Sequence, residues 1–489
     1  MQFAQLLRQA GIAPLAQEGQ AEVSAVCADS RQAGPGSCFV AIRGPLADGH
    51  DHIASAVAAG ATAVVCQEAS RAPAGVARAV VADSASAAGP LAQAILGWPS
   101  RRLTNIAVTG TKGKSTVTYM VRSILEQDGR PTGLLGTISY QTGRRSVPAG
   151  NTTPGAVELA GLCHEMVAAG MTHLVMETSS HALHQGRTAG IDFAAGVFTN
   201  LSGEHMDYHR TMHEYLDAKA ILFERLGESA AAVVNADDPA GREIARRTRA
   251  RLCRYGLGDD VDLRGRIESL EPTGTWFVMD WAGRRQRVFT PLIGRHNVYN
   301  GLAAAGACLA LGVDLETAAR GLEALRRVPG RMERVGGEGC FQVFVDYAHT
   351  DDALQKALES LAPLRRGRVI LVFGCGGDRD RTKRPRMARV AQRLADRIVV
   401  TSDNPRTEDP LAIIDQIVSG LDADGRSRTT IEPDRRRAIE LAIDAAQAGD
   451  IVLIAGKGHE NYQIIGTARI GFDDVEVAQE CLRQREGVA

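Results

Sequence analysis

The sequence predicts an α/β protein with three domains, and three observations support this fold class. Strand-like, β-branched runs alternate with Ala-, Leu- and Arg-rich helical stretches almost throughout, which favours largely parallel sheets. A chain of 489 residues is also too long for one hydrophobic core. Finally, "GWPSRR" at 97–102 and "RRVPGR" at 326–331 interrupt helical patterns just before strands. We therefore expect a small N-terminal α/β domain over 1–98, a central domain over 99–328 and a C-terminal domain over 329–489.

The composition excludes several classes of protein. Hydrophobic residues make up 44% and charged residues 23% of the chain, as in ordinary soluble globular proteins. The 56 basic and 57 acidic residues leave a net charge of -1, so no global field directs the chain to nucleic acid or to a membrane surface. The nine cysteines are scattered, without paired spacing, which favours a reducing compartment over a disulfide framework. The first residues read as an amphipathic helix and no apolar run could span a bilayer, so we expect a cytoplasmic protein.

The central domain begins with a phosphate-loop pattern. In "NIAVTGTKGKSTVTYMVRSIL" a buried strand leads into a Gly-rich turn and then a helix that begins near Lys114. Gly110 and Gly113 allow backbone N–H groups to approach a polyphosphate, Lys114 can reach the outer phosphates, and a hydroxyl of Ser115 or Thr116 can ligate Mg²⁺. Two residues, Thr111 and Lys112, separate the glycines where the usual loop has four. The pattern predicts ATP binding and a central parallel sheet of the P-loop type flanked by helices.

Two further strands carry candidate metal ligands at their ends. Glu177 follows "THLVM" and His205 comes after "GVFTN", so both should lie at the sheet edge that holds the phosphate loop. A carboxylate and an imidazole there can complete a Mg²⁺ shell with phosphate oxygens and water. His205, His209 and His213 also have the i, i+4, i+8 spacing of a zinc face, but no fourth ligand follows at metal spacing. We therefore expect structural roles for His209 and His213.

Three loops of the last domain follow strand-like runs and carry the chemistry of an amino-acid site. They are "FGCGGDRD", "DNPR" and "GKGHE", and their carboxyl-end positions should bring them to one edge of a Rossmann-like sheet. Guanidinium groups suit carboxylates, while acids and amides suit ammonium groups, and Pro405 fixes the turn of the second loop. The candidate amino-acid-binding residues are Arg379, Asp403, Asn404, Pro405, Arg406, Gly456 and Glu460.

Taken together, these segments resemble one family. The shortened phosphate loop and the Glu177 and His205 segments occur in order with "HNVYNGLAA" from His296, "GRME" from Gly330 and "VDYAHTDDAL" from Val345. The set is similar to the Mur ligase family of ATP-dependent amino-acid ligases, nearly end to end. The resemblance implies ATP and Mg²⁺ as cofactors, with catalytic roles for Lys114, Glu177, His205 and Lys219.

The resemblance assigns further roles around the nucleotide. It implies that Lys219 is carbamylated to N6-carboxylysine, and that Ser115, Glu177, His205 and the Lys219 carbamate bind metal. Helical context alone makes Lys219 an exposed lysine. The resemblance also assigns Asn297, Asn300, Arg331 and Asp346 to the adenine and ribose. The two asparagines are otherwise helix-start polar residues, and Arg331 with Asp346 is otherwise an interdomain ion pair.

By the same resemblance, a nucleotide-sugar peptide contacts the first two domains. The residues it assigns are Ser30, Asn151, Thr152, Thr153, Ser179, Gln185 and Arg187, together with the Gly44–Ala47 turn. One of Thr152 and Thr153 is alternatively the N-cap of the helix that follows Pro154. The segment around Ser30 reads equally well as ordinary turns.

The activity implied is ATP-dependent ligation of meso-2,6-diaminopimelate to the D-glutamate of UDP-N-acetylmuramoyl-L-Ala-D-Glu, through an acyl phosphate. "DNPR" is typical of diaminopimelate-adding members, whereas lysine-adding members generally lack this Arg. An Arg406 that pairs with the distal carboxylate of diaminopimelate would be left desolvated and unpaired by lysine. The alternatives are a lysine-adding ligase, a folylpolyglutamate synthase-like ligase and a non-catalytic nucleotide-binding protein. We expect a monomer that binds only these small molecules.

Overall fold

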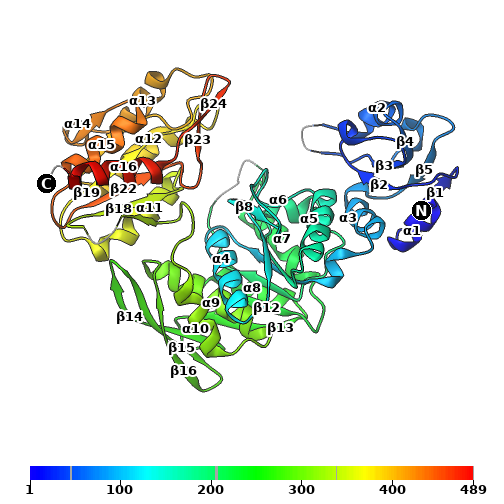
Figure 1. Ribbon diagram of the computed structural model, residues 1–489, viewed down its shortest axis with the longest axis horizontal. Helices are drawn as coiled ribbons and strands as arrows, with labels where there is room; N and C mark the ends of the chain where they lie inside the picture. Colours follow the sequence, from blue (N-terminus) through cyan, green and yellow to red (C-terminus); the bar gives the residue numbers. More distant parts are fainter. Residues whose placement is uncertain (45–46, 204–207, 337–338, 488–489) are drawn as a thin grey trace. The chain divides into compact units, whose positions relative to one another are not determined.

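The computed structural model describes residues 1–44, 47–203, 208–336 and 339–487 (Figure 1). Its contacts divide the chain into two compact units, each of which draws on more than one stretch of sequence. The first contains Met1–Arg266, Val278–Val288 and Tyr299–Ala324, and the second contains Ile267–Phe277, Phe289–Val298 and Leu325–Ala489. No helix among the described residues has the length and apolar character needed to span a membrane.

The N-terminal part of the first unit is built on a five-stranded sheet of order β1-β5-β4-β3-β2. Strands β2 to β5 are parallel, and β1 pairs antiparallel with β5. Residues such as Val40, Val65 and Leu91 form its buried core. The elements are α1 (Phe3–Gln9), β1 (Ala16–Glu18), β2 (Ala25–Cys27), η1 (Ser30–Gln32), β3 (Ser37–Val40), η2 (Gly49–His52), α2 (Ile53–Ala58), β4 (Ala61–Cys66), η3 (Ala69–Arg71), β5 (Ala77–Val80), α3 (Ser84–Ile95) and η4 (Pro99–Arg102).

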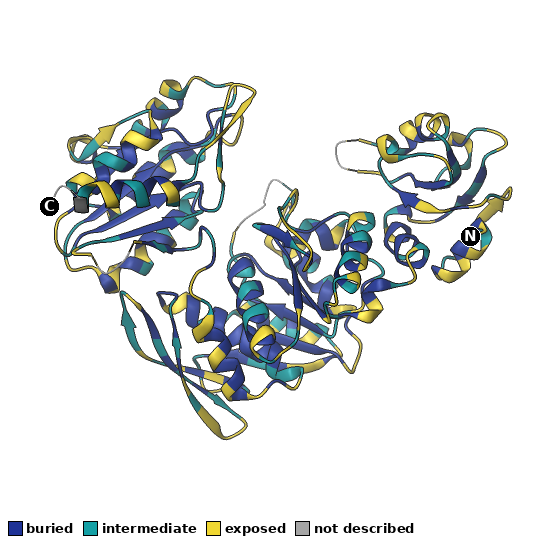
Figure 2. Ribbon diagram, viewed as in Figure 1, coloured by how far each residue is buried: buried dark blue, intermediate teal, exposed yellow. Residues whose placement is uncertain are grey.

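The central sheet places its functional loops at one edge. Its order is β16-β15-β14-β13-β12-β11-β6-β10-β7-β8-β9. The neighbours from β14 to β7 in this order are parallel, and β8 and β9 continue the sheet antiparallel. The strand β6 is buried along most of its length, as its β-branched sequence predicts, and β12 is buried throughout (Figure 2). The elements are β6 (Thr104–Thr109), α4 (Lys114–Gln127), β7 (Thr132–Leu135), β8 (Ser139–Gln141), β9 (Ser146–Pro148), α5 (Ala156–Ala168), β10 (His173–Glu177), α6 (Ser180–His184), β11 (Ala195–Phe198), α7 (Met212–Glu224), β12 (Ala231–Asn235), α8 (Pro239–Arg247), β13 (Arg251–Gly256), β14 (Leu263–Glu271), β15 (Gly274–Trp281), β16 (Arg284–Thr290), α9 (Arg295–Ala310) and α10 (Leu315–Ala324).

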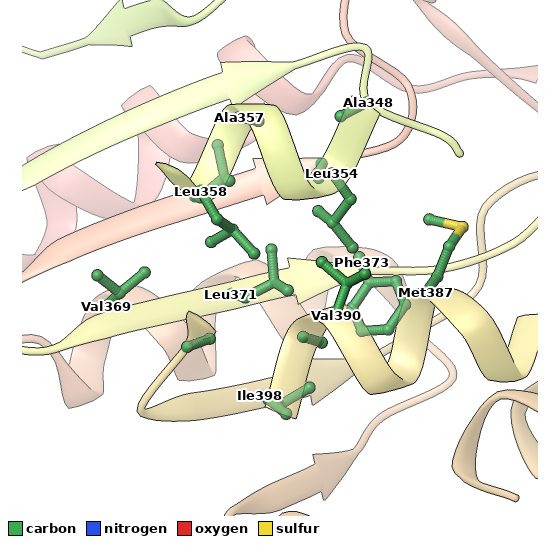
Figure 3. Close-up of a cluster of buried hydrophobic side chains, with 14 of the residues drawn as sticks. Ala348, Leu354, Ala357, Leu358, Val369, Leu371, Phe373, Met387, Val390 and Ile398 are labelled. Carbon is green, nitrogen blue, oxygen red and sulfur yellow. The ribbon is translucent and has the colours of Figure 1, made fainter. Parts of the chain in front are cut away.

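The sheet of the second unit is covered by helices on both faces. Its order is β17-β18-β22-β19-β20-β21, and all pairs except β17–β18 are parallel. Along β19, Leu371 and Phe373 pack with the residues of α11 and α12 (Figure 3), whereas Ile370 and Val372 pack with the residues of α15 and α16. This two-residue alternation, apolar on both sides, explains the continuous run "VILVF".

The remaining elements complete the second unit. They are β17 (Glu333–Val335), β18 (Gln342–Asp346), α11 (Asp351–Leu361), η5 (Ala362–Leu364), β19 (Val369–Phe373), α12 (Lys383–Leu394), β20 (Arg397–Val400), α13 (Pro410–Val418), α14 (Ala423–Ser427), β21 (Thr429–Ile431), α15 (Arg435–Ala445), β22 (Ile451–Ala455), β23 (Tyr462–Ile465), β24 (Ala468–Gly471) and α16 (Asp474–Gly487). Strands β23 and β24 form a separate antiparallel hairpin.

The predicted α/β class with largely parallel sheets is confirmed. The strands β1–β5, β6–β16 and β17–β22 fall within the segments 1–98, 99–328 and 329–489 respectively. The boundaries of these segments stay a prediction.

Candidate active site

The loop between β6 and α4 approaches its neighbours closely at its two glycines. Gly110 has a φ of 138°, and a Cβ there would lie 1.9 Å from Thr199 Oγ1 and 3.1 Å from Asn200 N. Gly113 has a φ of 87°, and its Cβ would lie 2.4 Å from Asn300 Oδ1. Both glycines are therefore favoured by the loop's conformation, and Asn300 lies against the loop.

Lys114 begins α4 and folds back over this loop. Its Nζ donates hydrogen bonds to the carbonyl oxygens of Gly110 at 3.0 Å and Thr111 at 2.9 Å. The N-cap residue, Gly113, provides no side-chain acceptor for the first N–H groups of the helix. A cation and a helix N-terminus thus meet at one loop, which fits a polyphosphate. Ser115 and Thr116, in the first turn, are buried.

Glu177 lies at the end of β10, beside the phosphate loop's strand. In the parallel register it is the partner of Val108 on β6. Its buried carboxylate accepts hydrogen bonds from Thr137 N at 2.8 Å and from Thr137 Oγ1 at 3.1 Å. Each carboxylate oxygen keeps a further lone pair, so Glu177 fits the role of a metal ligand held in a set orientation.

The structure describes two of the three histidines between His205 and His213. His205 lies outside the described residues. His209 is buried, with Nε2 2.9 Å from Ser180 Oγ, and burial together with neighbouring imidazoles lowers its pKa. The ring of His213 is exposed and lies 3.5 Å from Asp217. The described residues contain no group of three His, Cys, Asp or Glu side chains that could hold a metal.

Lys219 is buried, and the expectation of an exposed helical lysine is wrong. Only 1% of the residue is exposed. Its Nζ donates to Gly110 O at 2.9 Å and lies 4.2 Å from the centroid of the Tyr215 ring. The turn of α7 that carries Lys219 packs against the sheet, which sequence periodicity alone did not reveal.

Four of the residues assigned to the nucleotide-sugar peptide, Thr153, Ser179, Gln185 and Arg187, form a connected group at the end of β10. Thr153 Oγ1 donates to Glu177 O at 2.9 Å and accepts from Ser179 N at 3.0 Å. Arg187 donates to Thr153 O at 3.2 Å and to Gln185 Oε1 at 2.7 Å. The alternative of a threonine N-cap is wrong, because Gly155 is the N-cap of α5 and neither threonine caps it.

Thr152 and Asn151 continue this group toward the surface. Thr152 Oγ1 lies 3.0 Å from Thr137 Oγ1, the hydroxyl that also contacts Glu177. Asn151 has an exposed side chain, and its carbonyl accepts a hydrogen bond from Tyr140 OH at 2.5 Å. Ser30 begins η1 and is half-buried. Of the Gly44–Ala47 turn, residues 45–46 lie outside the described residues.

The other predicted nucleotide residues lie in the second unit. Asn297 is buried and its Nδ2 donates to Ile293 O at 2.8 Å. Asp346 accepts from the backbone N–H groups of Met332 at 2.7 Å and Ala348 at 2.9 Å. Arg331 lies in the same unit as Asp346, which argues against an ion pair that joins two units.

Two strand-end loops of the second unit meet at Asp403 and Gly456. Asp403 follows β20 and is buried, as is Pro405. Gly456 follows β22 with a φ of 119°, and a Cβ there would lie 2.7 Å from Asp403 Oδ2. The predicted convergence of the "DNPR" and "GKGHE" loops is therefore observed.

Asn404 links these loops to the β23–β24 hairpin. Its Nδ2 donates to Glu460 Oε2 at 2.9 Å, and its Oδ1 accepts from Ile464 N at 2.9 Å. Lys457 is fully buried, and its Nζ contacts Asn404 Oδ1 at 3.3 Å and Glu460 Oε2 at 3.2 Å. We expected Asn404 to bind an ammonium group. Instead, its side-chain oxygen and nitrogen both have partners within the protein, and the hydrogen bond from Nδ2 orients Glu460.

Arg406 adopts a left-handed conformation with a φ of 52°. Its N–H donates to Ile464 O at 3.0 Å, and its Nη1 donates to Gly377 O at 2.8 Å in the third loop. The half-buried guanidinium therefore bridges two of the three loops. Arg379, on the third loop, is exposed.

Sequence reasoning missed three residues that hold this group together. Lys457 lies within the quoted "GKGHE", where adjacency to Gly456 could have identified it. Arg384 and Arg435 are fully buried, but each looks like an ordinary helical arginine in sequence. Arg384 pairs with Glu408, and this ion pair lowers the pKa of Glu408 to about 2.

Comparisons with known proteins agree with this arrangement. Residues 22–96 match the profile of the Mur ligase family catalytic domain, 108–308 that of the Mur ligase middle domain and 330–458 that of the Mur ligase glutamate ligase domain.

Individual relatives extend the similarity over nearly the full length. The chain is 47% identical over 469 residues to the UDP-N-acetylmuramoyl-L-alanyl-D-glutamate--2,6-diaminopimelate ligase of Gloeobacter violaceus, covering 95% of this chain and 94% of that one. It is 45% identical to the enzyme of the same name from Geobacillus kaustophilus, with 96% of each chain covered. A solved structure of a ligase of this name superposes with a TM-score of 0.69 and 33% identity over 95% of each chain. The chain belongs to the Mur ligase family.

Proposed function

We propose that this protein is an ATP-dependent ligase that joins meso-2,6-diaminopimelate to the D-glutamate of UDP-N-acetylmuramoyl-L-Ala-D-Glu. The reaction belongs to the cytoplasmic synthesis of peptidoglycan precursors. The observation that carries the proposal is the 47% identity to a ligase named for this reaction, over 95% of the chain. The loop geometry supports the proposal, because one unit contains the phosphate loop and the other contains the loops that are candidates for binding an amino acid.

The chemistry requires activation of a carboxylate. A carboxylate at neutral pH is a poor electrophile, because it is anionic and would have to expel oxide. Transfer of the γ-phosphoryl group of ATP to the glutamate carboxylate forms an acyl phosphate and releases ADP. The amine of the incoming amino acid then attacks the acyl carbon, loses a proton and expels phosphate. The protein's task is to position three anionic partners and to neutralise their charge.

The phosphate loop supplies the groups for this task. The ammonium of Lys114 and the loop N–H groups bind the β- and γ-phosphates, with Gly110, Thr111, Lys112 and Gly113 forming the cradle. Asn297, Asn300, Arg331 and Asp346 contact the adenosine. Ser115, Glu177, His205 and carbamylated Lys219 would hold Mg²⁺, which when bound would neutralise charge on the phosphates.

The peptide substrate and the amino acid bind at the two groups of residues described above. Asn151, Thr152, Thr153, Ser179, Gln185 and Arg187 hold the nucleotide-sugar peptide, with Ser30 at its uridine end. Arg406 pairs with the distal carboxylate of diaminopimelate, and Arg379, Asp403 and Glu460 contact its other charged groups. Lysine lacks the distal carboxylate and would leave Arg406 unpaired, which we expect to cost roughly 100-fold or more in kcat/KM.

A phosphate-release assay tests the proposal. The purified protein is given ATP, Mg²⁺ and the UDP-linked dipeptide, with diaminopimelate or lysine in parallel reactions, and each substrate is omitted in turn. We expect phosphate release only when all three substrates are present, and a strong preference for diaminopimelate. Phosphate release with lysine but not with diaminopimelate would identify a lysine-adding ligase. The absence of turnover with every combination would reject ligation.

A further inference from the structure

Arg435 and Asp474 form a fully buried ion pair in the second unit. Both side chains have no exposed surface. Arg435 Nε donates to Asp474 Oδ1 at 2.7 Å, and Nη2 donates to Oδ2 at 2.7 Å. The two residues begin α15 and α16. Burying such a pair costs desolvation that the mutual attraction only partly offsets, so the pair is a poor stabiliser compared with apolar residues of similar size.

The remaining hydrogen bonds of Arg435 lead to the amino-acid site. Nη1 donates to Ser402 O at 3.3 Å, and Nη2 donates to Ala455 O at 3.0 Å. Ser402 immediately precedes Asp403, and Ala455 immediately precedes Gly456. One rigid, planar guanidinium therefore joins the two strand-end loops at the residue before each of them.

The two loops that Arg435 joins lie close together, with little free space between Gly456 and Asp403. A Cβ on Gly456 would lie 2.7 Å from Asp403 Oδ2 and 3.9 Å from Arg435 Nη2. The positive charge of Arg435 also interacts with the carboxylates of Asp403 and Glu460. Both acids are candidates for contacting the amino acid, and Arg435 holds the backbone directly before Asp403 through its bond to Ser402 O.

We propose that Arg435, oriented by Asp474, is a positioning residue for the amino-acid substrate, because it fixes the distance between the Asp403 and Gly456 loops. The inference rests on the proposed function of these loops. It adds that the KM for diaminopimelate depends on a guanidinium that does not touch the substrate.

A second ion pair, at the opposite end of the sheet of the second unit, provides a control. Arg368 Nη2 lies 2.6 Å from Asp450 Oδ2, and Asp450 is buried. These residues precede β19 and β22 at the amino ends of the strands, whereas the proposed site lies at the carboxyl ends. Loss of this pair should affect stability without affecting the amino-acid site.

The test compares three variants in the full-length protein. Arg435→Met combined with Asp474→Leu removes both charges together, which avoids an unpaired buried carboxylate and is compatible with folding. We expect a rise of roughly 10- to 100-fold in KM for diaminopimelate, as a displacement of about 1 Å produces, with KM for ATP unchanged. Arg435→Lys keeps the charge and should recover part of the loss. Arg368→Met combined with Asp450→Asn should leave both KM values unchanged.

Hydrogen exchange separates failure of this inference from failure of the proposed function. The amides of 403–406 and 456–464 should exchange faster in the Arg435→Met/Asp474→Leu variant than in the wild type, whatever reaction the protein catalyses. Unchanged exchange in these segments, or an equal rise in KM for both substrates, would overturn the positioning role. Faster exchange in a protein whose wild type does not use diaminopimelate would reject the proposed function and retain the role of Arg435 in loop spacing.

Discussion

Lys219 Nζ donates a hydrogen bond to the carbonyl oxygen of Gly110 at 2.9 Å, although the two residues are 109 positions apart in the chain. A buried amine thus contacts the first glycine of the phosphate loop. A carbamate formed on this amine would place a carboxylate-like group next to the phosphate loop.

Replacement of Lys219 by Met should lower the rate of phosphate release far more than it lowers the stability of the fold. We expect phosphate release to fall by roughly 100-fold or more, because the carboxylate-like group can no longer form. Loss of the hydrogen bond to Gly110 should cost about 1–3 kcal/mol of the free energy of unfolding. Thermal unfolding and the three-substrate assay measure the two effects. If depleting bicarbonate and CO₂ leaves wild-type turnover unchanged, carbamylation is not required.

Gly110→Ala should abolish nucleotide binding for two reasons. The new Cβ would clash with Thr199 Oγ1, and the alanine backbone would have to adopt a φ of 138°. Gly129→Ala is the matched control, since Gly129 follows α4 with a φ of 72° and has open space around it. The control should lose only about 1–2 kcal/mol of stability from backbone strain. Titration with ATP by calorimetry distinguishes the two, and equal ATP affinity in both variants would contradict the close-packed loop.

Arg406→Ala should lower the selectivity for diaminopimelate over lysine by roughly 100-fold. The reason is that only diaminopimelate has a carboxylate for this guanidinium to bind. Arg397→Ala, at the exposed start of β20, the strand that precedes the Arg406 loop, should leave the selectivity as in the wild type. Both kcat/KM ratios are measured in the phosphate-release assay, and an Arg406→Ala enzyme with undiminished selectivity would remove Arg406 from the specificity site.

Glu408→Gln should make stability less sensitive to acid. The ion pair with Arg384 lowers the pKa of Glu408 from 4.5 to about 2 in the folded protein. Its contribution to stability is therefore complete above about pH 4.5 and is lost as the pH falls toward 2. Urea unfolding at pH 6 and at pH 3 should show a smaller decrease for Glu408→Gln than for the wild type. The exposed Glu476→Gln variant should follow the wild type, and parallel loss in all three proteins would contradict the prediction.

Local sequence patterns determined much of this protein. The α/β class follows from alternating strand and helix patterns, and the phosphate loop follows from two glycines and a lysine between a strand and a helix. The meeting of the Asp403 and Gly456 loops follows from parallel topology, because loops after neighbouring parallel strands share one edge.

Only the tertiary structure decided how individual side chains are used. Lys219 looks exposed in its own helix, and its burial depends on a loop 109 positions away. Thr153 looks like an N-cap, yet its hydroxyl joins Glu177 to Ser179. Asn404 and Arg435 acquire their roles from partners on separate strands and helices. Periodicity reports which face of an element is apolar, but the partner of a buried polar group depends on which distant elements pack together, and that is a property of the folded chain.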